Sequence, residues 1–148
     1  MPRVTIGSDH AGVALRRQMG ELLSGRGWEV QDLGPEEGTS VDYPDYARRV
    51  ARSVAAGEAE LGLLVCGTGI GMSIAANKID GVRAALLSDA LTGRLAKEHN
   101  DANVIVLGAR VTGSDRARSA IEAFLDAHFT EARHVRRVGK IMDLEGNR

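Results

Sequence analysis

The 148-residue sequence contains one cysteine, no long apolar run and almost no excess charge, and each absence excludes a class of protein. Cys66 has no second cysteine with which to form an internal disulfide, so we expect a reduced thiol and a cytoplasmic location. No apolar run reaches the length of a membrane span, and the start MPRVTIGSDH lacks the apolar centre of a signal peptide. The formal net charge of −1 gives no global reason to bind nucleic acid or an anionic membrane. Any basic site must therefore be local.

Short β-rich runs alternate with longer helix-like segments, which is typical of parallel βαβ units. The predicted strands are residues 4–7, 29–33, 61–66, 82–87 and 103–107. The predicted helices are residues 11–24, 46–56, 70–77, 90–99, 114–128 and, beyond the last strand, 130–147. The 43% hydrophobic content and the lack of low-complexity tracts predict one compact domain over residues 1–148. We expect an α/β fold, with an open α/β/α sandwich around five parallel strands and an extra C-terminal helix.

Open parallel sheets bind ligands beyond the carboxyl ends of their strands, so chemistry is expected at that edge. The first predicted strand is followed by GSDHAG at residues 7–12, and the third by CGTGIG at residues 66–71. The fourth and fifth flank KEHNDANV at residues 97–104, and the fifth continues into LGAR at residues 107–110.

Three glycines at alternate positions, Gly67, Gly69 and Gly71, lie between a predicted strand and a predicted helix. Glycines there let backbone amides approach an anion, which suits an oxyanion or a phosphate. The dinucleotide fingerprint needs its third glycine one residue later, where this chain has Met72, and no P-loop ending follows. The spacing therefore argues against a nucleotide site.

Cys66 ends an apolar strand and precedes these glycines, so two interpretations are open. Free cysteines are often buried core residues, but a nearby helix N-terminus favours a thiolate, which would serve as a base or nucleophile. Asp9 is placed equally well for an N-cap and for a functional role. His10, beside this carboxylate at a strand end, suits proton transfer or phosphate contact.

A cationic segment, RHVRR at residues 133–137, begins the last predicted helix. Arg133 and Arg137 are four residues apart and share a helix side, where they would hold a phosphate, although a solvated face is the alternative. His99 ends a predicted helix, a position that attracts a protonated histidine without any catalytic role. A thiol, an oxyanion-binding loop and an arginine pair together suit proton movement next to a carbonyl in a phosphorylated metabolite.

The segments GSDHAG, DYPDYA, CGTGIGMSIAANK, EHNDANV, LGAR and RHVRRV occur in this order over nearly the whole chain. In this respect the sequence resembles the type B ribose-5-phosphate isomerases, in the group that includes allose-6-phosphate and galactose-6-phosphate isomerases. The resemblance implies a Rossmann-like sandwich, a homodimer or dimer of dimers, no metal or organic cofactor, and aldose–ketose isomerisation through an enediolate.

The resemblance also implies roles for individual residues. Cys66 matches the proton-abstracting cysteine, and Met72 stands where other members have a glutamate base. The loop that steadies the enediolate corresponds to Thr68 with Gly67, Gly69, Ile70 and Gly71. Asp9 and His99 match residues that bind the sugar and open its ring. His10, Arg133 and Arg137 match residues that bind the phosphate. Tyr43, Asn100 and Arg110 match residues that make further contacts to the substrate. Arg110 is expected to reach the pocket of a partner subunit.

The leading hypothesis is thus a ribose 5-phosphate isomerase. One alternative is an isomerase of a six-carbon aldose 6-phosphate, because one extra carbon changes pocket depth and not the catalytic groups. Another is a noncatalytic phosphosugar-binding module, which would not need Cys66.

Overall fold

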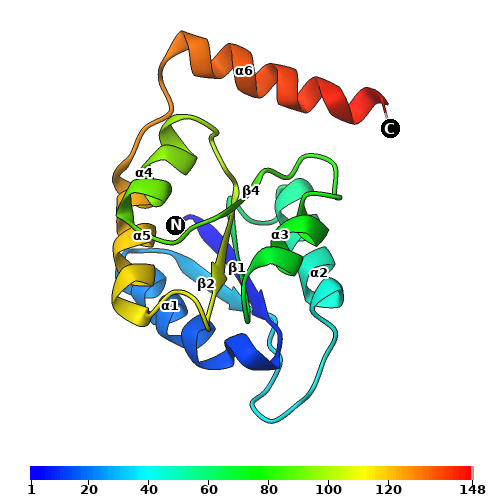
Figure 1. Cartoon of the computed structure of the whole chain (residues 1–148), viewed down its shortest axis with the longest axis vertical. Helices are drawn as coiled ribbons and strands as arrows, with labels where there is room; N and C mark the ends of the chain where they lie inside the picture. Colours follow the sequence, from blue (N-terminus) through cyan, green and yellow to red (C-terminus); the bar gives the residue numbers. More distant parts are fainter. Residues whose placement is uncertain (148) are drawn as a thin grey trace.

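The computed structural model describes residues 1–147 and contains one five-stranded parallel sheet with the strand order β2-β1-β3-β5-β4. The strands are β1 (Arg3–Ser8), β2 (Glu29–Asp32), β3 (Leu61–Cys66), β4 (Ala84–Leu86) and β5 (Val104–Gly108). Ser8 pairs with Val65 and Cys66 with Gly108, so β1, β3 and β5 end at one common edge (Figure 1). The predicted parallel sheet is confirmed.

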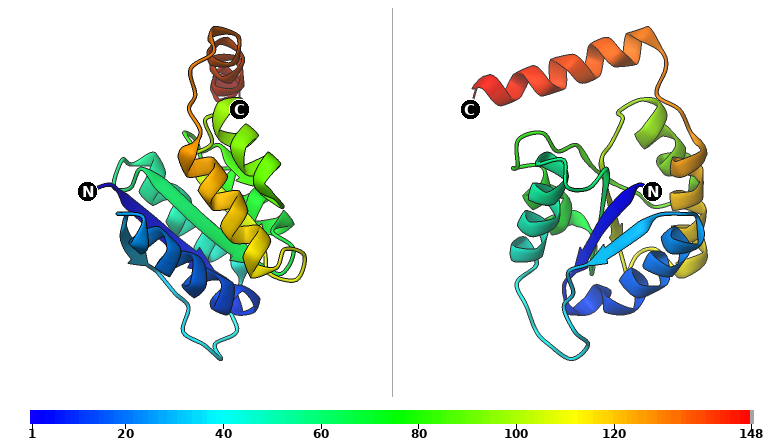
Figure 2. Two further views of the ribbon diagram at one scale, coloured as in Figure 1. Left: turned by 90° about the vertical axis from the view of Figure 1, so that its left-hand side faces the viewer. Right: turned by 180° about the vertical axis from the view of Figure 1, so that it is seen from behind.

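Helices cover both faces of the sheet, as predicted for a three-layer sandwich (Figure 2). One face carries α1 (Val13–Gly25), α4 (Ala90–Glu98) and α5 (Ser114–Asp126), whose apolar side chains share one core cluster. The other face carries α2 (Tyr43–Ala55) and α3 (Ile70–Ala76), which share a second cluster. A short 3-10 helix, His10–Gly12, precedes α1.

Side chains of β3 alternate between the two clusters, as the pleat requires. Leu63 and Val65 belong to the α1 face, whereas Leu64 and Cys66 belong to the α2 face. Cys66 therefore lies at the end of a fully buried strand and points toward the face covered by α2 and α3. This register decides which elements surround the thiol.

Two of the element boundaries that differ from the sequence prediction have a clear local cause. Helix α2 begins at Tyr43 and not at residue 46, because Pro44 occupies the first turn, where its fixed φ suits a helix and no amide donor is needed. Strand β4 spans only Ala84–Leu86, because the Arg83 amide is bonded to the Asn103 side chain and not to the sheet.

The last helix is shorter than predicted and stands apart from the sandwich. Helix α6 spans Ala132–Asp143 and continues as a 3-10 turn, Leu144–Asn147. Figures 1 and 2 show it projecting across the end of the sheet where the strands begin. Its contacts with the sandwich include a stack of His134 on His99 and a bond from the Gly81 amide to Glu145. No helix within residues 1–147 combines the length and apolar character needed to cross a membrane.

Candidate active site

Cys66 lies at the centre of the group of candidate residues at the carboxyl edge of the sheet. Its side chain is 5% exposed, and its Sγ accepts a hydrogen bond from the Gly69 amide at 3.2 Å. Gly69 has a φ of +80°, a left-handed conformation that suits glycine and turns this amide back toward the sulfur. The glycine loop, residues 67–71, therefore contacts the thiol directly.

The side chain of Arg110 lies against the same loop of the same chain. The Arg110 amide donates to the Gly67 carbonyl at 2.8 Å, and the guanidinium packs over the Gly67 Cα, where an added Cβ would meet Nη1 at 3.4 Å. Thr112, buried two residues later, donates its amide to Gly108. The turn after β5 therefore folds back on its own loop. Within one chain, the Arg110 side chain thus lies beside its own Cys66 loop.

Tyr43 completes the opposite wall of this site. Its ring lies so close to Gly71 that a Cβ at residue 71 would be 2.5–2.8 Å from the ring and hydroxyl atoms. Gly71 therefore lets the first residue of α2 cover the glycine loop. Thr68 Oγ1 accepts the Ile70 amide at 3.2 Å, which fixes the hydroxyl at the exposed tip of the loop.

Asp9 and His10 lie beside Cys66 because β1 is the neighbour of β3, as expected from the sequence. The Asp9 amide donates to the Val65 carbonyl at 3.1 Å. Asp9 Oδ1 accepts the amides of Ala11 and Gly12 at 2.9 and 3.1 Å, so Asp9 is an N-cap, one of the two interpretations left open. His10 is exposed, and its Nδ1 accepts the Val41 amide at 3.4 Å.

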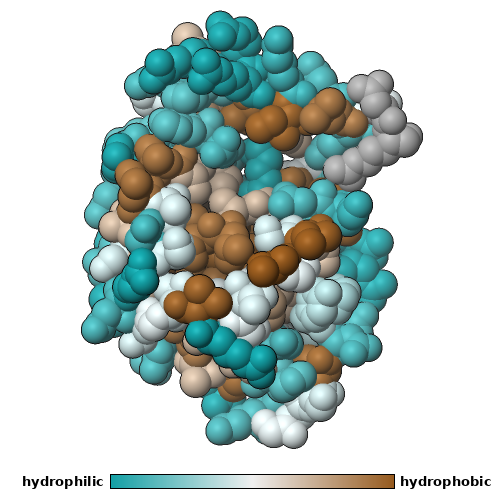
Figure 3. All heavy atoms as spheres, in the orientation of Figure 1, coloured by the Kyte–Doolittle hydropathy of each residue, from teal (hydrophilic) through white to brown (hydrophobic). Residues whose placement is uncertain are grey.

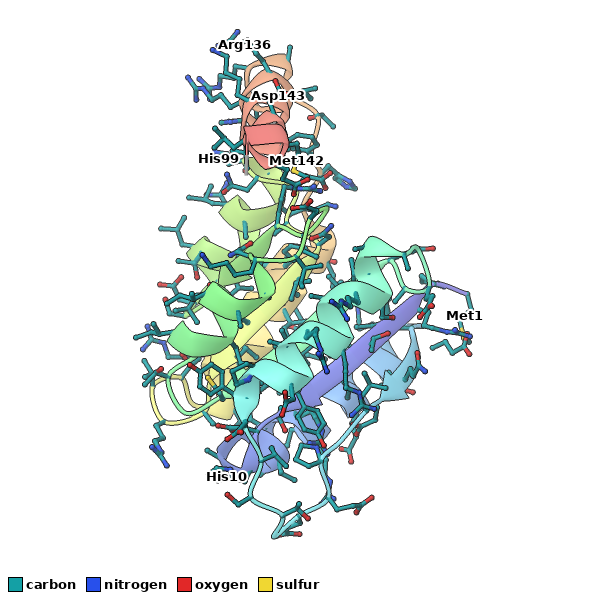
Figure 4. All side chains as sticks on the ribbon, turned by 90° about the vertical axis from the view of Figure 1, so that its right-hand side faces the viewer. Met1, His10, His99, Arg136, Met142 and Asp143 are labelled. Carbon is teal, nitrogen blue, oxygen red and sulfur yellow. The ribbon has the colours of Figure 1, made fainter. Side chains whose placement is uncertain are left out.

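The segment KEHNDANV lies at the opposite edge of the sheet. Helix α4 runs back from the carboxyl edge, and the Asn103 carbonyl accepts a hydrogen bond from the amide of Gly62, the second residue of β3. The five residues of β5 then separate this point from Cys66 by about 16 Å. Figure 4 shows His10 and His99 at opposite ends of the molecule. One chain therefore does not bring His99 and Asn100 to Cys66.

Arg133 and Arg137 belong with His99 at the amino edge. The His99 and His134 rings stack with centroids 4.1 Å apart, which anchors the first turns of α6 beside the end of α4. Arg133 is exposed and pairs with Glu131 at 2.9 Å, and Arg137 is also exposed. The candidate residues thus form two groups: a carboxyl-edge group around Cys66, and an amino-edge group of His99, Asn100, Arg133 and Arg137.

His134 was not among the site residues expected from the sequence. It is 5% exposed, and burial lowers its pKa below the ordinary value, with the charges of His99 and Arg133 acting in the same direction. The only sequence signal was its place within RHVRR, where its neighbours suggest a solvated face. Within residues 1–147, no three His, Cys, Asp or Glu side chains come together as metal ligands.

Comparisons with known proteins agree over almost the whole chain. Residues 4–141 match the Ribose/Galactose Isomerase family. Ribose-5-phosphate isomerase B of Escherichia coli strain K12 is 42% identical over 148 residues, which cover 100% of this chain and 99% of that protein.

Two solved structures are similar in fold as well as in sequence. The ribose-5-phosphate isomerase B of Clostridium thermocellum superposes with a TM-score of 0.95 at 46% identity, covering 98% of each chain. The corresponding Mycoplasma genitalium protein, solved with bound ribulose-5-phosphate, has a TM-score of 0.93 at 39% identity, covering 99% of this chain and 97% of that one. Since the family match and these similarities all span nearly the full length, the chain belongs to the Ribose/Galactose Isomerase family.

Proposed function

We propose that the protein interconverts ribose 5-phosphate and ribulose 5-phosphate through an enediolate, with Cys66 as the base. The observation that carries the proposal is the buried Cys66 thiol, held by the Gly69 amide at the mouth of a glycine loop. The relatives named ribose-5-phosphate isomerase B support the choice of substrate. The lone thiol and a phosphorylated metabolite as substrate support a cytoplasmic location.

In the proposed reaction, the Cys66 thiolate removes the proton from C2 of the open-chain aldose. The electron pair of the broken C–H bond forms the C1–C2 double bond, and the C1 carbonyl oxygen becomes the enediolate oxygen. The C2 hydroxyl proton then passes to the C1 oxygen, and Cys66 returns its proton to C1 as the C2 carbonyl forms, which yields the ketose and the thiolate without any net gain or loss of electrons. Met72 has no basic group and is fully buried, so it takes no part in proton transfer.

The glycine loop and Thr68 would stabilise the enediolate oxygens. A C2 proton is far too weakly acidic for an unaided thiolate, so this stabilisation supplies much of the rate. Loss of one preorganised donor to such an oxyanion typically costs about a hundredfold to a thousandfold in rate. The Gly69 amide already donates to Cys66 Sγ, so proton transfer to the thiolate would release this donor for the developing charge.

His10 is suited to bind the substrate phosphate. Because the Val41 amide donates to Nδ1, a neutral His10 ring carries its hydrogen on Nε2, which is then a donor toward an anion. Arg110, which packs on the loop beside Cys66, supplies a cation on the same side of the site. Asp9 and Tyr43 would contact the sugar hydroxyls.

A homodimer would complete the site with the amino-edge group of the second copy. Four of the assigned residues, His99, Asn100, Arg133 and Arg137, lie at the far edge of their own chain, so they would serve a neighbour's Cys66. Exposed apolar side chains support such pairing (Figure 3). They lie on α3, β4, α4 and the turn after β5 and are Ile70, Ile74, Leu86, Leu91 and Val111.

The test compares the purified protein with a Cys66→Ala variant on several aldose 5- and 6-phosphates in deuterated water. Wild type should convert ribose 5-phosphate and exchange its C2 proton, whereas Cys66→Ala should bind the sugar phosphate and do neither. A stronger preference for a six-carbon aldose 6-phosphate would change the substrate and keep the mechanism. Substantial residual exchange in Cys66→Ala would assign the base to another residue. Binding without isomerisation by wild type would indicate a noncatalytic module.

A further inference from the structure

Arg16 is a buried arginine that lies outside the residues assigned to the reaction. It belongs to α1, on the side that packs against the sheet, and its side chain is only 2% exposed. Burial of a guanidinium is costly unless its donors are satisfied by well-placed partners. The position of those partners therefore indicates why the arginine is there.

All three partners of Arg16 lie where β1 ends and where the β2–α2 loop, residues 33–42, begins. Nη1 donates to Ser8 Oγ at 2.6 Å, and Nη2 donates to the Pro35 carbonyl at 2.9 Å. Nε forms an ion pair with Asp32 Oδ1 at 3.1 Å. The guanidinium thus ties the last residue of β1 to both sides of Gly34.

Backbone contacts reinforce the same junction. The Ser8 amide donates to the Gly34 carbonyl at 3.1 Å, and Asp32 Oδ1, besides pairing with Arg16, accepts the Gly34 amide at 2.8 Å. Arg16 is the residue whose side chain contacts both the end of β1 and the β2–α2 loop. Its planar guanidinium carries several donors, which allows these contacts simultaneously.

Both segments held by Arg16 lead directly to His10. Ser8 precedes Asp9 and His10 in the chain, and the β2–α2 loop returns to His10, where the Val41 amide donates to Nδ1. Figure 4 shows His10 beside this loop. A shift of either segment would move the imidazole or remove the donor that sets its tautomer.

We propose that Arg16 is a positioning residue for the substrate phosphate, which acts by joining the end of β1 to the β2–α2 loop and thereby fixing His10. This inference rests on the proposed function, because it concerns the same site. Arg16 does not contact substrate. Its effect is transmitted through Ser8 and Pro35 to the ring of His10.

The primary test is Arg16→Lys, which retains the positive charge and removes the planar guanidinium. We expect the Val41 amide to exchange faster with deuterium, and the KM for ribose 5-phosphate to rise about tenfold, the factor that corresponds to one hydrogen bond to a charged group. The kcat should fall much less than KM rises. Arg17→Lys is the matched control. Arg17 is the next residue, is largely exposed, and contacts the same loop only through Glu36 and Glu37 at 3.9 and 3.5 Å.

A double-mutant cycle with His10→Ala separates positioning from a merely structural role. If Arg16 acts through His10, Arg16→Lys should raise KM in wild type and have almost no further effect on the His10→Ala background. An equal rise of KM on both backgrounds would overturn the inference. So would an unchanged KM in a folded Arg16→Lys variant.

Ser8→Ala repeats the same cycle if Arg16→Lys does not fold, because it removes one acceptor and leaves the guanidinium paired with Asp32 and Pro35. A rise of about threefold in KM, absent on the His10→Ala background, supports the inference, and no rise overturns it. Failure of the proposed function is distinguishable, since wild type would then isomerise no sugar phosphate. In that case, Val41 amide exchange in the Arg16→Lys and Ser8→Ala variants still decides whether this junction holds His10, and unchanged exchange overturns it.

Discussion

His134 is a buried histidine whose ring is stacked on that of His99 and whose environment is unusually cationic. Its nearest charged neighbours are Arg133, Arg137 and Glu131, and only Glu131 favours the protonated ring. Burial has the largest effect, and it lowers the pKa of His134 below 6.5. The neutral ring is therefore part of the folded structure that holds α6 against the end of α4.

This arrangement predicts that acid weakens the folded protein at His134. Between the lowered folded-state pKa and 6.5, the unfolded chain binds more protons at this residue than the folded chain does. The contribution to stability is thus fully present above pH 6.5 and is lost as the pH falls through the lowered pKa. Urea unfolding midpoints at pH 7.5 and 5.5 should show a smaller acid loss for His134→Phe, which keeps a ring and does not titrate.

His128→Gln is the control for that measurement, because His128 is exposed. It should retain the acid loss of wild type. Equal acid losses in wild type and His134→Phe would mean that His134 titrates as freely when folded as when unfolded.

Single residues differ in how far the sequence reveals their role. Cys66 and the glycines that follow it could be proposed as a site because a thiol directly before alternate glycines at a strand end suits an anion, although core burial of the thiol was the alternative. Arg16 could not, although it lies in register with Met19 and Leu23 on the apolar side of α1. A charged residue in such a stripe finds partners only in the folded chain, here at Ser8 and Pro35, 8 and 19 residues away along the sequence.

Helices α4 and α5 pack closely at Gly93, and the contact depends on the absence of a side chain there. A Cβ at residue 93 would overlap the Ala120 carbonyl oxygen, and its next neighbours are also Ala120 backbone atoms. Backbone cannot rotate aside as a flexible side chain does. The helix pair must therefore separate if residue 93 becomes larger.

Gly93→Ala should accordingly destabilise the protein by about 3 kcal/mol, the upper part of the range for overpacking. In a chain of this size, that loss corresponds to a decrease of about 10 °C in Tm. Thermal unfolding followed by circular dichroism measures it.

The matched control is Gly139→Ala in α6, where nothing lies within 4 Å of the added Cβ. Alanine in an open helical position should leave stability unchanged or raise it by less than about 1 kcal/mol. Similar Tm values for the two variants would show that α4 and α5 can separate at little cost.

At the scale of elements, hydrophobic pattern was sufficient to predict the order of strands and helices but not every boundary. The continuous apolar run of β3 and the spacing of apolar residues in α1 have no good alternative. The start of α2 was predicted too late, at residue 46, whereas Pro44 occupies the first helical turn, where a proline fits. The short β4 depends on Asn103, a residue 20 positions from Arg83, which local pattern does not report.

In the whole molecule, the carboxyl-edge group and the amino-edge group lie at opposite edges of the sheet and are separated by its length. The sequence could suggest which residues take part, but not this separation, because it arises from α4 running back to the amino edge. Under the proposed function, the carboxyl-edge group and the amino-edge group of one chain would belong to two different active sites.

Mixing two inactive variants tests this separation. Cys66→Ala damages the carboxyl-edge group and Arg137→Ala the amino-edge group, so a mixed dimer would contain one doubly damaged site and one intact site. Random pairing of equal amounts should therefore restore about a quarter of wild-type activity. The measurement is isomerase activity after joint refolding, with mixed dimers verified by native mass spectrometry.

The matched control for mixing is Cys66→Ala with Arg110→Ala. Arg110 lies on the Cys66 loop of its own chain, so both changes damage the same group and no intact site can form in a mixed dimer. Recovery in this control, or none with Arg137→Ala, would contradict the assignment.

Because α6 projects away from the sandwich, its position constrains how copies of the chain would assemble. A row of chains joined head to tail, each offering its α6 to the next, would leave a Cys66 pocket unfilled at one end and an unused α6 at the other. Such a row has no reason to stop growing. In a two-fold dimer, each chain instead places its α6 over the Cys66 pocket of the other. Both pockets are then filled, so the assembly closes at two copies. The position of one helix would thus favour a finite particle over a filament.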